Sequence, residues 1–449
     1  MTAPERNTQE ARDFVVKTAR EQGVKFVRLW FTDILGFLKS FALPVEGLEE
    51  ALDEGVGFDG SSIQVFVRID ESDMIAMPDP STFCILPWRP KERGSVARMF
   101  CDLYTPDRKP FEGDPRFVLK KNLKKAADMG YIYYVGPELE YFYFKDNKGT
   151  EPLDVGGYFD MDAHDAAMNL RRDTVLALEE MGIAVDKSHH EVAFSQHEID
   201  MRYDDALTMA DNVMTYRLVV KQIALQQGVY ATFMPKPVFG INGSGMHVHQ
   251  SLFKGNNNAF FDPKERFHLS KIGASFLAGL LKYAPEFTAV TSQWVNSYKR
   301  LVPGYEAPVY LSWAQRNRSD LIRLPQYKVG KEKETRFEIR SPDPAANPYL
   351  CFSVLLAAGL AGIEEKLVPP PPVEENVYHM SEKDRKRRRI GQLPGSLWEA
   401  ILLTEKSRLV REALGEHVFN AFIENKKLEW DRYRVLVTGY ELEKYLPIL

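Results

Sequence analysis

Over most of the chain, apolar residues recur with the period of a helix or alternate with the period of a strand. One helical segment, within residues 113–130, carries clear boundary signals: Asp114 is a candidate N-cap, Pro115 stands at the first helical position and Gly130 ends the helix. The same patterns predict helices over residues 7–23 (capped by Asn7), 164–182 and 204–228, and strands over residues 24–33, 136–144, 183–203 and 243–253. This alternation of helices and strands predicts an α+β or α/β fold.

The N-terminal part of the chain differs from the rest. Up to about residue 104 it consists mainly of short β runs broken by proline and glycine, as in MPDPSTFCILPWRP. This pattern predicts a small β-rich domain. We place the domain boundary so that the N-terminal domain covers residues 1–106 and a larger C-terminal domain covers residues 107–449.

Composition narrows the class of protein. The chain has 449 residues, of which 44% are hydrophobic and 12% aromatic, enough to bury a large core. Its formal net charge of −5 shows no basic excess, which argues against nucleic acid as the main partner. The three cysteines lack metal-ligand spacing, which suggests free thiols in a reducing compartment. Neither a signal peptide nor an apolar run of membrane length is apparent, so a cytoplasmic protein without a membrane partner is expected.

Two glutamates in the segment GPELEYFYF pose a physical problem. Glu138 and Glu140 lie on the same face of a strand that otherwise reads as buried, with Cα atoms about 6 to 7 Å apart. At an effective dielectric near 20, two such charges repel by about 2 to 3 kcal/mol, and burying each carboxylate costs more. A solvated edge strand, raised pKa values, nearby arginines or bound cations could each offset this cost.

Other segments concentrate acids, histidines and arginines. Three are strand-like and have ordinary explanations: an exposed hairpin, a structural histidine pair and cross-strand salt bridges. The fourth is a loop-like stretch rich in proline and glycine, where arginines suit carboxylate and phosphate oxygens. The residues are Glu191 and Glu198 beside His189, His190 and His197; His247, His249 and Ser251; Arg336, Glu338 and Arg340; and Arg300, Glu306, Arg316, Arg318 and Arg323.

Together these residues indicate metal-dependent chemistry. Ligands rich in oxygen, with one imidazole and no thiolate, favour Mg²⁺ or Mn²⁺ over structural Zn²⁺. Two such ions and several arginines suit phosphoryl transfer, in which negative charge develops on phosphate oxygens. No P-loop is present, and GVGFDG follows a helix-like segment instead of the strand that a dinucleotide fingerprint requires. The residues therefore predict a metal-dependent phosphoryl-transfer enzyme without naming its substrate.

Several motifs in order resemble glutamine synthetase of the bacterial and archaeal type I, specifically its shorter, unadenylylated alpha subtype. They are FDGSSI, ESDM, GPELEYFYF, GGYF, SHHEVA, QHEID, NGSGMHVH, RLVPGYEAPV, AQRNRS and RFEIRSPDPAANPYL. The resemblance implies an α+β fold: a small N-terminal β-grasp domain and a large C-terminal catalytic domain with a curved, mainly antiparallel sheet flanked by helices. It also implies a homo-oligomer, a dodecamer of two hexameric rings with active sites between subunits.

The resemblance implies that ATP and two to three Mg²⁺ or Mn²⁺ ions serve as cofactors. ATP would phosphorylate the γ-carboxylate of L-glutamate, and ammonia, delivered as ammonium, would attack γ-glutamyl phosphate to give glutamine, ADP and phosphate. One metal would be held by Glu140, Glu191 and Glu198. The metal on the ATP side would be held by Glu138, His247 and Glu338.

Further roles follow from the same resemblance. Asp59 would take a proton from ammonium, and Glu306 would close the site against water. Arg318 and Arg340 would stabilise the transferring phosphoryl group. The residues implied for nucleotide binding are Tyr203, His249, Ser251, Arg323 and Lys333, and those implied for glutamate and ammonium are Arg300, Gly243, Asn242, Tyr158 and Ser62.

The chain also departs from the family pattern. Phe194 and Ser195 stand where proline and glycine are usual, and Tyr378 lies in NVYHMS, unlike the motif of members regulated by tyrosine adenylylation. Arg68 matches an arginine used in feedback inhibition, and a nitrogen-regulatory protein is a candidate partner. Two alternative functions stay open: a γ-glutamyl-polyamine or other γ-glutamyl-amine ligase on the same fold, and a catalytically inactive structural homologue.

Overall fold

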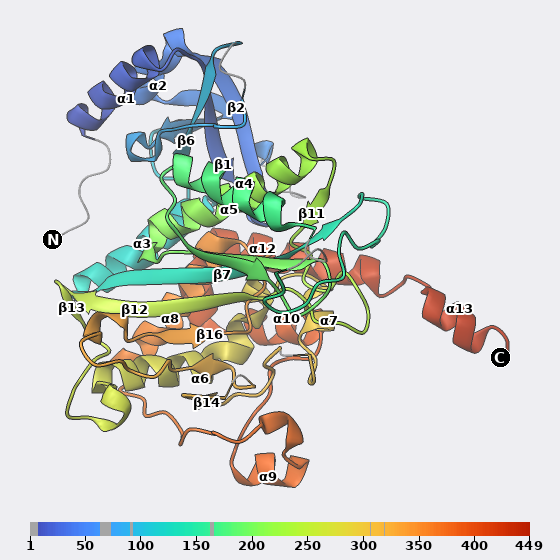
Figure 1. Cartoon of the computed structure of the whole chain (residues 1–449). Coiled ribbons are helices and arrows are strands. Elements are labelled where there is room, and N and C mark those ends of the chain that lie inside the picture. The colour runs from blue at the N-terminus through green and yellow to red at the C-terminus, as the bar shows by residue number, and fades with distance from the viewer. Residues whose placement is uncertain (1–7, 63–72, 90–92, 162–165, 306, 318) are drawn as a thin grey trace.

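The computed structural model shows a chain with two β-sheets and many helices (Figure 1). The predicted α+β class is confirmed. The three cysteines, Cys84, Cys101 and Cys351, are free, as predicted. The structure describes residues 8–62, 73–89, 93–161, 166–305, 307–317 and 319–449.

The N-terminal part forms the smaller sheet. Within the described residues it has six strands in the order β2-β1-β6-β4-β3, with β5 paired to β6. Two helices, α1 (Gln9–Glu21) and α2 (Leu48–Glu54), accompany it. The strands are β1 (Val24–Thr32), β2 (Leu38–Pro44), β3 (Val56–Asp59), β4 (Asp73–Pro78), β5 (Cys84–Ile85) and β6 (Ser95–Tyr104).

Helix α1 begins where the sequence predicts, but its cap differs. The hydroxyl of Thr8 accepts a hydrogen bond from the backbone N–H of Ala11 at 3.2 Å, so Thr8 is the N-cap. The prediction that Asn7 caps this helix is therefore wrong by one residue, and Asn7 itself lies outside the described residues. Threonine and asparagine are both good caps, and here the extended backbone of Thr8 aims its hydroxyl at the free amide.

A buried arginine ties the two parts of the chain together. Arg116, on α3 (Pro115–Asp128), pairs with Asp79 at 2.7 Å and Asp102 at 2.6 Å in the N-terminal part. It also pairs with Asp211 of the C-terminal part at 3.0 Å. Because breaking a buried ion pair leaves an uncompensated charge, this cluster holds the small sheet firmly against the large domain.

The large sheet is mainly antiparallel, as predicted. Among the described residues it has ten strands, with β14-β15-β16-β12-β7-β9-β8 as its main path and only the β14–β15 pair parallel. The strands are β7 (Ile132–Phe144), β8 (Val185–His190), β9 (Gln196–Met201), β10 (Asp204–Asp205), β11 (Tyr230–Thr232), β12 (Met246–Lys254), β13 (Asn257–Asn258), β14 (Trp313–Ala314), β15 (Ile322–Arg323) and β16 (Phe337–Ile339).

Strand β7 separates the core from a cavity. Leu139 and Tyr141 belong to the main hydrophobic core, and Tyr141 contacts Tyr216 of a packed helix. Glu138 and Glu140 alternate with them and line a cavity on the other face. The period-two prediction for these glutamates is therefore confirmed, and because β7 pairs on both sides it is not an edge strand.

Helices cover the core face of the large sheet, and α8 packs against α3, α5 and α6. The apolar run of α8 lies within the core, and among the described residues no helix is both long and apolar enough to cross a membrane. Helix α13 extends away from the rest of the chain (Figure 1). Besides α3, the helices of this part are α4 (Met168–Glu180), α5 (Ala206–Gln226), α6 (Lys271–Thr291), α7 (Ser297–Arg300), α8 (Pro348–Glu364), α9 (Glu382–Arg387), α10 (Leu397–Glu405), α11 (Arg408–Leu414), α12 (Glu416–Tyr433) and α13 (Gly439–Tyr445).

Candidate active site

The cavity on the open face of the large sheet has a volume of about 380 Å³. Carboxylates, histidines and arginines from several strands and loops line it. Many of the residues singled out from the sequence therefore converge, although they are far apart along the chain. Those that line the cavity are Glu138, Glu140, Tyr158, His189, Glu191, Glu198, Asn242, Gly243, His247, His249, Arg300, Arg323, Arg336, Glu338 and Arg340.

Strand register organises the acidic part of the cavity. The pairing of β7 with β9 and of β9 with β8 aligns two rows of side chains across three strands. Directly opposite side chains have Cβ atoms about 4.5 to 5.5 Å apart, so each row brings two acids together with one basic group. The first row consists of Glu138, Asp200 and Lys187, and the second row consists of Glu140, Glu198 and His189.

One group of potential metal ligands lies beside β12. Glu138, His247 and Glu338 each offer an atom within 4.8 Å of the others. Burial raises the pKa of Glu338, but the adjacent Arg340 outweighs it, so that its net pKa is below the ordinary value. Arg323 also pairs with Glu338 at 2.9 Å. These three residues form the set expected for a metal on the ATP side.

A second group of potential ligands lies between β8 and β9. His189, Glu191 and Glu198 again place one atom each within 4.8 Å of the others. The Nε2 atom of His189 is 2.9 Å from Glu191 Oε1 and 3.3 Å from Glu198 Oε2. Glu140 is close to this group, since the charge of Glu191 acts on it.

The acids of the second group carry more negative charge than the surrounding residues balance. Burial, followed by the charge of Glu191, raises the pKa of Glu140 to about 8. Burial and then the charge of Asp200 raise the pKa of Glu198 well above its ordinary value. Within the described residues, the buried Oε1 atom of Glu198 has no hydrogen-bond partner. Hard divalent cations fit such a site, because they bind oxygen ligands and supply the missing positive charge.

Arg300 lines the same cavity, and backbone carbonyls hold its guanidinium group. Its guanidinium group donates to the backbone carbonyls of Ser341 at 2.7 Å and Arg340 at 2.9 Å. A Cβ atom on Gly245 would lie 2.5 Å from Arg300 Nη2, so only glycine permits this close approach. The glycines of the NGSGMHVH segment therefore make room for the arginine.

Some predicted residues do not line this cavity. Tyr203 is exposed beside Tyr134, Ser251 is buried on β12, and Lys333 is exposed in a short 3-10 helix (Glu332–Glu334). Asp59 is exposed on the small sheet and accepts a hydrogen bond from the Ser61 backbone. Ser62 is described only as part of a short turn. Glu306, Arg318 and Arg68 lie outside the described residues.

Sequence reasoning assigned no role to several residues that line the cavity. His189 and Lys187 come from β8, and Gln196 donates from its Nε2 to Glu140 Oε2 at 2.9 Å. Arg336 donates to His249 Nδ1 at 3.1 Å, so that Nε2 of His249 carries the proton toward Glu138. The strand alternation around Glu191 and Glu198 weakly indicates which side chains share a face with them. The pairing register of the strands decides which of these side chains lie next to one another.

A third cluster, of buried polar side chains, supports the second group of potential ligands through the backbone of Glu191. Asp154 lies 2.8 Å from His190 and 3.2 Å from His197, and all three side chains are fully buried. The Nδ1 atom of His190 donates to the carbonyl of Glu191 at 2.7 Å. Arg171 lies 2.8 Å from His197 Nδ1, and its charge opposes a cation at this cluster. The cluster is therefore a hydrogen-bonded support and not a metal site.

Ser195 lies in the turn between β8 and β9 and connects that turn to the Asp154 segment of this cluster. Its backbone has a φ of 57°, the left-handed conformation that favours glycine. This conformation explains why glycine is usual at this position in the family that the chain resembles. Its buried hydroxyl accepts hydrogen bonds from the backbone N–H of Leu153 at 2.7 Å and of Asp154 at 3.0 Å. The hydroxyl therefore holds the Asp154 segment in place.

We expect Ser195→Gly to destabilise the subunit by about 1 to 3 kcal/mol, because two buried amides lose a partner while backbone strain is relieved. Ser195→Ala should be the less stable variant, because it loses the same bonds and keeps the strain. Urea unfolding of the variants measures this order. An alanine variant as stable as the glycine variant would show that the strain is negligible.

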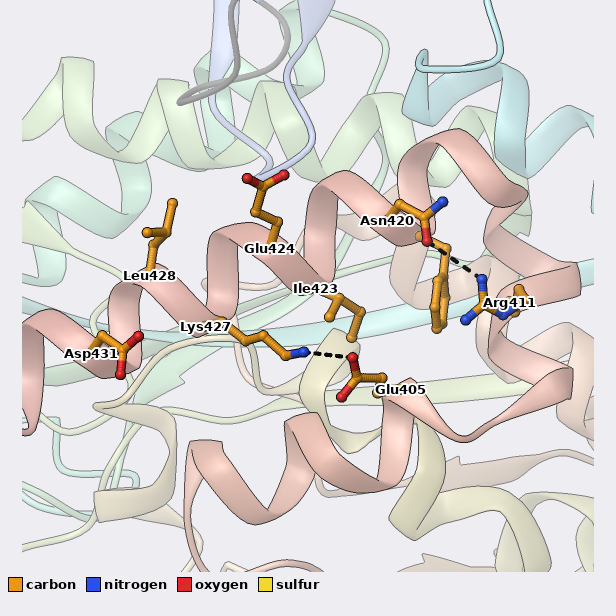
Figure 2. A pocket seen from close by; sticks show the side chains of 9 residues that line it. Glu405, Arg411, Asn420, Ile423, Glu424, Lys427, Leu428 and Asp431 are labelled. Carbon is orange, nitrogen blue, oxygen red and sulfur yellow. Dashed lines mark hydrogen bonds and ion pairs between the residues drawn. The ribbon is translucent and has the colours of Figure 1, made fainter.

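A second pocket, of about 370 Å³, lies at helices α10, α11 and α12 (Figure 2). Two of its basic side chains pair with neighbours: Lys427 with Glu405 at 2.5 Å, and Arg411 with Asn420 at 3.4 Å. Among its described lining residues there is no histidine. It therefore lacks the concentrated ligands of the first cavity.

Comparison with known proteins agrees with this geometry. Residues 23–106 match the profile described as "Glutamine synthetase, beta-Grasp domain", and residues 112–445 match "Glutamine synthetase, catalytic domain". Among curated relatives, glutamine synthetase of Methanosarcina mazei is 54% identical over 98% of each chain. That of Mycolicibacterium smegmatis is 53% identical over 97% of this chain and 99% of its own.

Solved structures give the same result. A structure titled "GmaS/ADP complex" has a TM-score of 0.88 at 31% identity, covering 96% of this chain and 99% of its own. Glutamine synthetase of Plasmodium falciparum has a TM-score of 0.86 at 26% identity, covering 97% of this chain and 98% of its own. The β-grasp domain and the catalytic domain with a curled sheet are thereby confirmed, and the chain belongs to the glutamine synthetase family.

Proposed function

We propose that this chain is a glutamate–ammonia ligase, which uses ATP to join ammonia to L-glutamate through γ-glutamyl phosphate and releases glutamine, ADP and phosphate. The observation that carries this proposal is the convergence of two carboxylate–histidine groups with buried arginines in one cavity. The family relatives support the choice of reaction.

Two to three Mg²⁺ or Mn²⁺ ions fit the acidic end of the cavity. Glu140, Glu191 and Glu198 would hold one ion. Glu138, His247 and Glu338 would hold another, on the nucleotide side. When bound, the ions supply positive charge for phosphate oxygens and for the γ-carboxylate. This arrangement also accounts for Glu138 and Glu140 on one strand face, because each serves a different cation.

Arginines and backbone groups would bind the substrates. Arg300 would face the carboxylate of glutamate beside Gly243 and Asn242, and Arg340 would stabilise the transferring phosphoryl group together with Arg318. For the nucleotide we propose a site formed by Tyr203, His249, Ser251, Arg323 and Lys333. The similar structure solved with ADP supports nucleotide binding on this fold.

Asp59 would remove the proton from ammonium, and Glu306 would shield the activated carboxylate from water. Tyr158 and Ser62 would shape the ammonium pocket. Because Asp59 does not line the cavity of its own chain, we propose that it serves a neighbouring subunit in a dodecamer of two hexameric rings. Domains over residues 1–106 and 107–449, a cytoplasmic location, feedback inhibition and a nitrogen-regulatory partner belong to the same proposal.

An acceptor panel tests the reaction. With ATP, Mg²⁺ and glutamate, we expect ammonium to give glutamine and stoichiometric phosphate, and methylamine and polyamines to give far less. Phosphate release and product mass spectrometry measure both. Turnover with amines but not ammonium would favour a γ-glutamyl-amine ligase, and no turnover by the assembled oligomer with any acceptor would favour an inactive homologue.

A further inference from the structure

One stretch of the cavity wall is held by a tyrosine that is distant in sequence. Tyr305 and Ala307 line the cavity, and Ala307 is buried. The hydroxyl of Tyr378, which does not itself line the cavity, donates a hydrogen bond to the carbonyl of Ala307 at 2.8 Å. The two residues are 71 positions apart, so this contact is made by the fold. The proposed function assigns Tyr378 no role.

Apolar packing fixes the tyrosine behind this wall. Ala307, Tyr310, Val373 and Val377 belong to one small hydrophobic cluster, and Tyr378 packs against that cluster. The ring of Tyr378 also contacts the ring of Tyr310, with 6.1 Å between the ring centres. The packed ring therefore aims the hydroxyl at the wall, and a phenylalanine would keep the packing while losing one hydrogen bond.

Other contacts hold the same stretch on either side of this bond. The ammonium group of Lys236 lies 4.1 Å from the centre of the Tyr305 ring, a cation–π contact. Further along, the carbonyl of Val309 accepts a hydrogen bond from the backbone N–H of Leu393 at 2.8 Å. The Tyr378 bond lies between these two contacts, so its loss would loosen the stretch between them and leave both ends in place.

This wall lies beside the part of the cavity proposed to bind glutamate. A Cβ atom on Gly243 would lie 3.2 Å from the side chains of both Lys236 and Arg300. Lys236, which contacts the wall through Tyr305, is therefore next to the groups proposed for the glutamate carboxylate. An activated glutamate formed there has to be kept from water until ammonia attacks it.

We propose that Tyr378 is a positioning residue whose hydroxyl holds Ala307 in the cavity wall and so keeps water from γ-glutamyl phosphate. This inference rests on the proposed function and adds a residue to its exclusion of water. Without the bond, the oxygen of a water molecule would bond to the γ-carbon more often. Phosphate would leave, a proton would pass to solvent and glutamate would be regenerated, so that ATP is consumed without forming glutamine.

Phosphate release without ammonium tests the proposal. In assembled protein with ATP, Mg²⁺ and glutamate, Tyr378→Phe should release phosphate about fivefold faster than the wild type, because one neutral hydrogen bond is lost. At limiting ammonium, phosphate should exceed glutamine, and the excess should shrink as ammonium rises. The KM for ATP should stay unchanged. General damage to the fold would instead lower both products together.

Tyr283→Phe is the matched control, because the hydroxyl of Tyr283 bonds to Glu365 outside the cavity. It should keep the wild-type rates. Hydrogen exchange followed by mass spectrometry gives a second measurement that needs no turnover. The peptide that contains Ala307 should exchange faster in Tyr378→Phe than in the wild type, and at the wild-type rate in the control.

Two results would overturn the proposal: wild-type exchange of this peptide in Tyr378→Phe, or phosphate release without ammonium no faster than in the wild type. A failed acceptor panel would refute the proposed reaction, and the exchange measurement would still show whether Tyr378 holds the wall. Glutamine formation by the wild type together with an unchanged Tyr378→Phe variant would refute the role of the tyrosine alone.

Discussion

Glu140→Gln should lower the rate of glutamine formation by about 10³-fold, because on the proposed function this carboxylate holds a cation whose positive charge faces the reacting phosphate. The amide oxygen can still accept the hydrogen bonds that Gln196 and the Gly245 backbone donate to Glu140, both at 2.9 Å. The substitution therefore removes charge and changes little else. Steady-state phosphate release with ATP, glutamate and ammonium measures the loss.

The same variant should be more stable than the wild type when metal is absent. Burial raises the pKa of Glu140 from 4.5 to about 8, so the folded protein binds more protons than the unfolded chain between these values. Stability of the metal-free wild type therefore falls as pH rises from about 4.5 to about 8, and the glutamine variant lacks this contribution. Thermal unfolding in EDTA at pH 5 and pH 8 should show its advantage growing with pH.

Glu151→Gln is the matched control, because Glu151 is an exposed acid outside the cavity that pairs with Lys145. It should leave both turnover and unfolding unchanged. Wild-type turnover in Glu140→Gln would contradict the metal-binding role. A lower unfolding temperature in EDTA at pH 8 would contradict the view that Glu140 is poorly compensated without a cation.

Asp59→Asn should reduce glutamine formation by about 10² to 10⁴-fold, the usual contribution of a positioned base. The side chain is exposed, so stability should change by no more than about 0.5 kcal/mol. If Asp59 serves the neighbouring subunit, co-assembly with Glu140→Gln subunits should restore activity. In a random mixture about a quarter of the sites combine both wild-type residues, because each site draws on two subunits.

Activity of the co-assembled protein above that of either parent is the diagnostic measurement. Each variant assembled alone provides the control. A mixture no more active than its parents would show that Asp59 does not complete a neighbour's site. Normal activity of Asp59→Asn alone would show that another group takes the proton from ammonium.

The sequence predicted what depends on local pattern. The alternation around Glu138 and Glu140 placed both on one strand face, and the Asp114 cap and Pro115 marked the start of α3, as the structure shows. These features follow from chain geometry within a few residues, so a single sequence contains them.

The parts that sequence reasoning missed depend on distant contacts. Lys187 and His189 join the acidic cluster only because β8 pairs with β9 in one register, and a shift by one residue would turn both away. Nothing in the sequence near position 195 shows that a serine hydroxyl would hold the Asp154 segment from 41 residues away. On the proposed function, the residues that Asp59 would meet belong to a neighbouring subunit, which one chain does not show.

The buried cluster around Arg116 has a consequence for coupling between the two half-reactions. The cluster ties the small sheet, which carries Asp59, to the rest of its own subunit. On the proposed function, the position of Asp59 relative to the neighbouring subunit's cavity then depends on how tightly the subunits pack in the ring. In a loosely packed ring, ATP would still phosphorylate glutamate, but water would hydrolyse γ-glutamyl phosphate before ammonia attacked it.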